Sequence, residues 1–213
     1  MCKNYFGEKM VLAYASDGKN TRGLPQGNYL KDHDFGVAKG NPGIPFKKGP
    51  HYIVQYRHPL ESIASLYEFR LFHGHDQDSR EDWNHFLERN VAFWKRFIEK
   101  WCLRDLSHTG IQLLRIAYRD LCDDPLGTLS RVVEFAPLDG LPVDPARLQA
   151  AVEKSSGNFA RYVQDQKEGI KTQTQRRQLR DFRYFSDRFP EIERELQSDY
   201  LGPLQIDSLF DPS

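Results

Sequence analysis

The chain has 213 residues, and its 30 Lys and Arg side chains balance its 30 Asp and Glu side chains, so the formal net charge at pH 7 is zero. A balanced charge excludes a general polyanion-binding protein, which carries a large basic excess. Hydrophobic residues make up 39% and aromatic residues 13% of the chain, which is enough to build a buried core. We therefore expect a single globular domain over residues 1–213, with a loop-rich part at 16–50 and a helical tail at 161–213.

The apolar runs and cysteines predict a cellular compartment. No apolar run approaches the roughly 18–20 residues that span a bilayer, and the first nine residues lack the apolar stretch of a signal peptide. Cys2, Cys102 and Cys122 form no C-x-x-C pair, which favours a reducing compartment over a disulfide framework. We expect a cytoplasmic protein that binds neither membrane nor nucleic acid, and the sequence leaves its oligomeric state open.

In chain order, the first elements predicted are short strands. The apolar run at 9–15 and the segment 28–33 fit strands, whereas Gly and Pro recur through 16–50 and favour loops. Residues 51–56 predict a further strand, which ends at Arg57-His58-Pro59. From residue 60 to 72 the apolar residues recur every three or four positions, which indicates a helix.

The remaining chain alternates between helices and one more strand. The pattern predicts a helix over 80–101, a strand over 111–118, and helices that begin at Pro125 and Pro145. Helical pieces are expected in the tail around 176–182 and 191–201. Strands separated by helices indicate an α/β fold, which we predict to have three layers around a parallel sheet. Ligands of such sheets bind at the carboxyl ends of the strands.

The most informative local pattern runs from Arg57 to Ser65. Arg57 stands at the carboxyl end of a predicted strand, and Pro59 suits the first turn of the helix that follows. A helix N-terminus attracts anions, and a guanidinium group matches phosphate oxygens. Ser65 lies within two turns of the helix start, where its hydroxyl could reach the same anion. The alternative, that Arg57 is a surface ion-pair residue and Ser65 a helix-face hydroxyl, stays open.

Residues 52–69, YIVQYRHPLESIASLYEF, resemble the 3′-phosphate-binding segment of sulfotransferases that use 3′-phosphoadenosine 5′-phosphosulfate (PAPS). That family places an Arg at a strand end and a Ser eight residues later, and both contact the 3′-phosphate. Arg57 and Ser65 match in type and spacing. Residues 118–129 are similar to the family's "Y-E-D-L … D-P … T-L" stretch, and residues 143–156 look like its next helix. The resemblance places Ser156 near the adenine and implies the P-loop nucleotide fold.

The resemblance also implies a catalytic base. Lys31-Asp32-His33 looks like the family's K-T-H segment, whose His removes the acceptor's proton. Such a step needs a group that titrates near neutral pH, as an imidazole does. Lys31, two residues earlier on the same strand face, could stabilise charge on the bridging oxygen as the nucleotide leaves. Without the resemblance, His33 would be read as an ordinary surface histidine.

Residues 14–22, YASDGKNTR, depart from the family's phosphate loop, Y-P-K-S-G-T/N-T. Ser16 stands where the family has its Lys, and the candidate cation, Lys19, follows Gly18 instead of preceding it. Asp17 adds a negative charge where an anion must sit. The loop is either degenerate or missing, and the sequence favours the second interpretation. In the tail, residues 161–183 hold seven Lys or Arg against three acids, which fits either a cap over a polyanionic cofactor or a solvated helix face.

We therefore expect a sulfotransferase that moves a sulfuryl group from PAPS to a hydroxyl or amine acceptor without a metal. The acceptor is expected to be a small molecule or a carbohydrate. The alternative is a non-catalytic nucleotide- or partner-binding protein on a truncated sulfotransferase fold. A phosphoryl-transfer enzyme is disfavoured because no G-x-x-x-x-G-K-[ST] motif is present. The segment 73–76, HGHD, is not predicted to bind a metal, because no further ligands recur at metal spacing.

Overall fold

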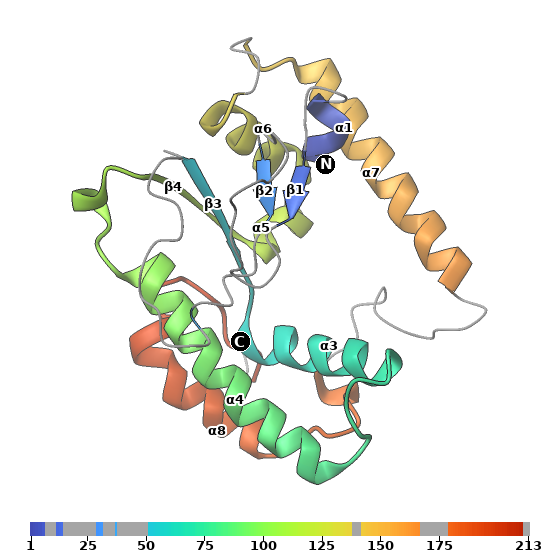
Figure 1. Ribbon diagram of the computed structural model, residues 1–213, viewed down its shortest axis with the longest axis vertical. Helices are drawn as coiled ribbons and strands as arrows, with labels where there is room; N and C mark the ends of the chain where they lie inside the picture. The colour runs from blue at the N-terminus through green and yellow to red at the C-terminus, as the bar shows by residue number, and fades with distance from the viewer. Residues whose placement is uncertain are drawn as a thin grey trace. The chain divides into compact units, whose positions relative to one another are not determined.

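The computed structural model divides the chain into two compact units, each made of two chain segments (Figure 1). The first unit comprises Met1–Tyr56 and Leu106–Lys171, and the second comprises Arg57–Asp105 and Thr172–Ser213. The predicted single domain stays a prediction. The structure describes residues 1–6, 12–14, 29–31, 37, 51–137, 142–166 and 179–210.

The described strands of the first unit form two parallel pairs. β3 (His51–Tyr56) runs parallel to β4 (Gln112–Ala117), with Tyr56 opposite Ala117 at their carboxyl ends. β1 (Leu12–Tyr14) and β2 (Tyr29–Lys31) form the other pair, also parallel. Parallel neighbours need a long crossover connection, and the chain between β3 and β4 supplies it with helices. The predicted α/β class with parallel strands is confirmed, and the described strands form two small sheets rather than one.

The core of the first unit lies between helices. α1 (Cys2–Phe6), α6 (Pro125–Phe135) and α7 (Pro145–Gln166) bury apolar side chains against one another. The N–H of Asp144, at the start of α7, donates to the Tyr5 hydroxyl at 3.1 Å, which ties α1 to α7. α5 (Tyr118–Asp123) follows β4 directly, and both α5 and α6 contact that strand. The buried set is Tyr5, Phe6, Leu129, Val133, Leu148 and Ala151.

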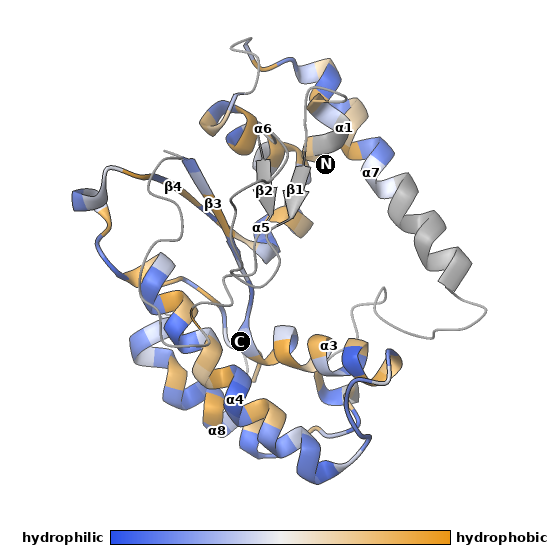
Figure 2. Cartoon of the chain, in the orientation of Figure 1, coloured by the Kyte–Doolittle hydropathy of each residue, from blue (hydrophilic) through white to orange (hydrophobic). Residues whose placement is uncertain are grey.

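The second unit is helical. α3 (Pro59–Phe72) and α4 (Arg80–Ile98) pack against each other, and α4 continues into a π-helical turn at Glu99–Leu103. After a 3-10 turn at Leu179–Asp181, α8 (Arg188–Leu196) runs into a second π-helical turn at Gln197–Leu201. Figure 2 shows apolar residues where α4 and α8 run together. The first unit adds one more 3-10 turn, at Ser107–Thr109.

An aromatic cluster fixes the tail within the second unit. Tyr67 of α3 is fully buried, and its ring lies 5.1 Å from Trp83 of α4. Phe182 packs against Trp83 at 4.6 Å, and Phe189 of α8 lies 5.8 Å from the same ring. Aromatic pairs in these arrangements add about 0.5–1.5 kcal/mol each beyond their buried area. The C-terminal segment is therefore a structural part of this unit rather than an appended helix.

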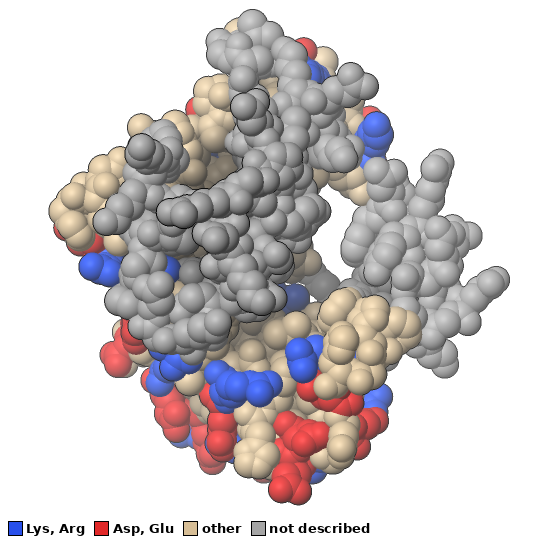
Figure 3. Space-filling view, in the orientation of Figure 1, with Lys and Arg blue, Asp and Glu red and all other residues tan. Residues whose placement is uncertain are grey.

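The described part of the surface seen in Figure 3 carries both signs of charge. On the face seen in Figure 3, basic and acidic side chains are interspersed over the second unit. This distribution agrees with the balanced net charge of the sequence. Among the described helices, none is both long and apolar enough to cross a membrane.

Candidate anion-binding site

The start of α3 is set by three consecutive residues. β3 ends at Tyr56, Arg57 and His58 connect it to the helix, and Pro59 occupies the first helical position. Proline fits there because its missing N–H would have no intrahelical acceptor. The carbonyl of His58 accepts the N–H of Ser62 at 3.1 Å, which closes the first turn.

This helix start lacks the usual side-chain cap. His58 has an extended backbone (φ −50°, ψ 128°), but its side chain makes no capping hydrogen bond. The N–H groups of Leu60 and Glu61 precede the first intrahelical donor, and they point out of the helix at its positive dipole end. Those two N–H groups are the donors that an anion would take.

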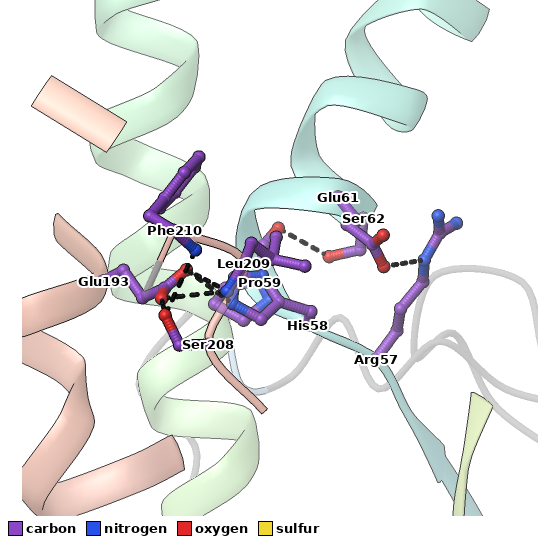
Figure 4. A network of polar contacts seen from close by, with 9 residues as sticks. All are labelled: Arg57, His58, Pro59, Glu61, Ser62, Glu193, Ser208, Leu209 and Phe210. Carbon is purple, nitrogen blue, oxygen red and sulfur yellow. Dashed lines mark hydrogen bonds and ion pairs between the residues drawn. The ribbon is translucent and has the colours of Figure 1, made fainter. Parts of the chain in front are cut away.

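Arg57 lies beside these donors. Its Nε donates to Oε2 of Glu61 at 3.2 Å, and Figure 4 shows its two terminal nitrogens pointing away from that carboxylate. The side chains are 33% and 36% exposed, and such i,i+4 surface pairs contribute only about 0.3–0.5 kcal/mol. The indole N–H of Trp94 donates to the Arg57 carbonyl at 3.0 Å and holds the backbone. Arg57 is thus an ion-pair residue in this structure, with a pair weak enough for a phosphate to displace.

Ser65 lies on the same side of α3. Glu61 and Ser65 are spaced four residues apart on one face of the helix, and Arg57, which precedes the helix, binds Glu61. Ser65 is half-buried and lies one helical turn beyond Glu61. Arg57 and Ser65 thus both neighbour Glu61, and their role in phosphate binding stays a prediction.

A buried contact between a histidine and a glutamate, which the sequence did not reveal, lies directly behind this site. The side chains of His58 and Glu193 are each only 5% exposed, and Nε2 of His58 lies 3.3 Å from Oε2 of Glu193 (Figure 4). Among the described residues, neither ring nitrogen of His58 has an aligned hydrogen-bond partner. Glu193 also accepts the Ser208 hydroxyl and, at 3.0 Å, the N–H of Leu209.

The electrostatics of Glu193 favour its charged form. Burial raises the pKa of this carboxyl, but the contacts with His58, Ser208 and the Leu209 N–H together lower it by more. The net pKa lies below the usual value for Glu, so Glu193 is ionised at neutral pH. The stability that these contacts give is present at neutral pH and is lost as the pH falls through the folded-state pKa. No local sequence pattern links Glu193 to His58, because 135 positions separate them.

The other predicted site residues lie in the first unit or outside the described residues. Lys31 ends β2, where its backbone pairs with Tyr14. Ser156 is exposed on α7, and its hydroxyl donates to the Val152 carbonyl of the same helix at 3.1 Å. His33 and Lys19 lie outside the described residues, as does the rest of the predicted phosphate loop after Tyr14.

Arg183, one of the basic residues of the segment 161–183, forms an ion pair within the second unit. It binds Asp78 at the turn between α3 and α4, and the Tyr184 hydroxyl donates to the same carboxylate. Both contacts lower the pKa of Asp78, and the hydrogen bond from Tyr184 lowers it most. Arg183 therefore ties the tail to the helix pair, whereas Arg180 is exposed.

A polar cavity of about 430 Å³ lies at the other end of α3. Gly74 lets the chain turn there with φ +67°, and His75, His85 and Arg89 line the cavity together with Asp76. Arg70 binds Asp76 through two hydrogen bonds, of 2.5 and 2.8 Å, and lowers the pKa of that carboxyl. Within the described residues, no group of three or more His, Cys, Asp or Glu side chains could hold a metal ion.

Residues 49–145 match the model of the sulfotransferase family. The matched span contains β3, α3, α4, β4, α5 and α6, and therefore the Arg57 site. No curated protein matches the chain.

Proposed function

We propose that this chain, which carries a sulfotransferase-family domain at residues 49–145, transfers a sulfuryl group from PAPS to a hydroxyl or amine. We propose a small molecule or a carbohydrate as the acceptor. The observation that carries the proposal is the start of α3, where Arg57 stands beside an uncapped helix N-terminus within the family match. The cytoplasmic location and the absence of a metal requirement remain predictions.

The proposed role of this helix start is to bind the 3′-phosphate. Arg57 would exchange the Glu61 carboxylate for the phosphate, while the N–H groups of Leu60 and Glu61 donate to its oxygens. The exchange is favourable because charge-assisted hydrogen bonds contribute about 1.5–3 kcal/mol, more than an exposed i,i+4 ion pair. Ser65 would add a hydroxyl donor from the same helix face. Ser156 is proposed to contact the adenine.

The proposed chemistry uses residues of the N-terminal segment. The acceptor oxygen or nitrogen attacks sulfur, the bond from sulfur to the bridging oxygen breaks, and His33 takes the acceptor's proton. Lys31 would stabilise the charge that develops on the bridging oxygen of the departing 3′-phosphoadenosine 5′-phosphate. Lys19 is the cation proposed to contact the 5′-phosphosulfate, although Asp17 beside it opposes the binding of an anion.

The first test compares two nucleotides that differ in the 3′-phosphate. The unmutated protein should bind 3′-phosphoadenosine 5′-phosphate more tightly than adenosine 5′-phosphate by calorimetry. Arg57→Ala should weaken the binding of 3′-phosphoadenosine 5′-phosphate by about 1.5–3 kcal/mol, or roughly ten- to 150-fold, because a charge-assisted pair is lost.

Arg119→Ala is the matched control for this test. Arg119 lies just after β4, and its Nε donates to Asp123 at 3.2 Å with the same i,i+4 spacing as the Arg57 pair. It should bind both nucleotides like the unmutated protein. Equal affinity of the unmutated protein for the two nucleotides would contradict the proposal that this site binds the 3′-phosphate.

The second test separates an enzyme from a nucleotide-binding protein. With PAPS and a panel of phenols, sugars and amines, His33→Ala should lower turnover about a hundredfold or more and leave nucleotide affinity nearly unchanged. His108→Ala, at an exposed histidine, is the control. Nucleotide binding without transfer to any acceptor, and without an effect of His33→Ala, would favour the non-catalytic alternative.

A further inference from the structure

Two contacts from distant parts of the chain converge on the two residues that precede α3. Trp94 of α4 holds the Arg57 carbonyl at 3.0 Å, and Glu193 of α8 lies 3.3 Å from the His58 ring. Glu193 is itself held by Ser208 and Leu209, which follow α8. Every residue of this set belongs to the second unit.

The element that carries Glu193 is firmly anchored. On α8, the neighbouring side chains of Phe189, Ile192 and Leu196 are all buried, and Phe189 packs into the aromatic cluster around Trp83. The carboxylate therefore has a fixed position relative to the helix pair α3–α4. A fixed charge against His58 restricts the ring, and hence the backbone between Arg57 and Pro59.

Stability alone does not account for this contact. Burial costs the Glu193 carboxylate and the His58 ring their hydration, and apolar side chains of similar volume in place of buried charged groups are often neutral or stabilising. Helix initiation does not need the pair either, since α6 begins with an Asp that caps its own first turn. The contact instead fixes the orientation of the His58 side chain, and thereby the backbone beside Arg57 and the first N–H groups of α3.

We propose that Glu193 is a positioning residue for the anion site, which acts through His58 to hold Arg57 and the N–H groups of Leu60 and Glu61 in place for a phosphate. This inference rests on the proposed function, because it assigns a role in binding the 3′-phosphate. It makes the C-terminal part of the chain necessary for a site that lies within the family match.

The test compares Glu193→Gln with Asp78→Asn. Glu193→Gln keeps the size of the side chain and removes its charge. It should lower the affinity for 3′-phosphoadenosine 5′-phosphate about tenfold, as expected for coupled residues in contact. Asp78→Asn loosens another tie between the tail and the helix pair, the contact with Arg183, and should leave that affinity unchanged. Thermal unfolding of both variants reports on the fold.

A double variant and hydrogen exchange distinguish positioning from general destabilisation. In the Arg57→Ala background, Glu193→Gln should cost little further affinity, because the group that it positions is gone. The amide of Ser62, which donates to the His58 carbonyl, should exchange faster in Glu193→Gln than in the unmutated protein, and at the unmutated rate in Asp78→Asn. If Glu193→Gln does not fold, Ser208→Ala loosens the carboxylate and keeps its charge, and the same comparisons apply to it.

The outcomes separate this inference from the proposed function. If the unmutated protein prefers the 3′-phosphorylated nucleotide but Glu193→Gln binds it equally well, or loses as much affinity in the Arg57→Ala background, the positioning role is wrong. If the unmutated protein shows no preference, the proposed function fails, and hydrogen exchange then decides the role of Glu193. Faster exchange of the Ser62 amide would support that role, and an unchanged rate would overturn it.

Discussion

Helices α3 and α6 both begin with proline, but only in α6 does the side chain of the residue before the proline cap the first turn. Before α6, the Asp124 carboxylate accepts the N–H of Gly127 at 2.9 Å. Before α3, His58 makes no such cap and contacts Glu193 instead. The first turn of α6 is thus satisfied by its own segment, whereas that of α3 is left for an acceptor from outside.

The other helix starts show that a missing cap is not enough to define a site. α7 follows the pattern of α6, with Asp144 accepting the N–H groups of Ala146 and Arg147, and α4 is capped by Ser79. α8 also begins without a side-chain cap, but the arginine at its start binds Glu88 at 2.7 Å. The start of α3 combines an uncapped turn, an adjacent Arg and a position directly after a parallel strand. The start of α5 shares these features, with Arg119 in its first turn, but α5 has only six residues whereas α3 has 14.

The largest effect expected outside the anion site comes from removing the cap of α6. Asp124→Ala should lower the free energy of unfolding by about 1 kcal/mol, within the usual range of 0.5–2 kcal/mol for a lost cap. It should leave nucleotide affinity unchanged. Arg57→Ala should show the reverse, with a large loss of affinity and a stability change of about 0.5 kcal/mol or less.

Urea unfolding and calorimetry on both variants measure this contrast. It requires that each variant move one quantity and spare the other. A loss of nucleotide affinity in Asp124→Ala comparable to that in Arg57→Ala would show that the two helix starts do not have separate roles.

Local patterns predicted most of the elements next to the site. The strand at 51–56 has the predicted bounds, and Pro59 with the apolar spacing after it predicted α3, whose residues Leu60, Ile63, Ala64 and Tyr67 are buried. These signals depend only on neighbours in sequence, on alternation in a strand and on a stripe in a helix. Pro125 and Pro145 marked the starts of α6 and α7 for the same reason.

The features that were not predicted depend on short helices or on long-range contacts. The sequence does not predict α1 and α5, which have five and six residues, too few to show a helical period. The predicted helix over 80–101 is α-helical only to Ile98 and then turns into a π-helix. Glu193 has no local pattern that separates it from a surface glutamate, because its burial results from the packing of α8 and residues 208–210.

The smallest effect tests the geometry of the α6 cap itself. A Cβ on Gly127 would lie 2.1 Å from Oδ2 of Asp124, so Gly127→Ala must displace the capping side chain. The variant loses a cap worth about 1 kcal/mol and gains about 0.5–1 kcal/mol from alanine in a helix, so its net change in stability should be close to zero. In the Asp124→Ala background the obstructing carboxylate is absent, and the same substitution should stabilise the protein by about 0.5–1 kcal/mol.

The position of α3 that corresponds to Gly127 holds a charged side chain. Glu61 stands there, third in its helix as Gly127 is in α6, and its carboxylate turns to Arg57. A double-mutant cycle by urea unfolding should give a coupling of about 1 kcal/mol between positions 124 and 127, since the two side chains compete for one space. A Gly127→Ala effect that is the same in both backgrounds would mean that Asp124 does not cap α6 in solution. The first turns of α3 and α6 would then both be open, and Arg57 alone would distinguish the anion site.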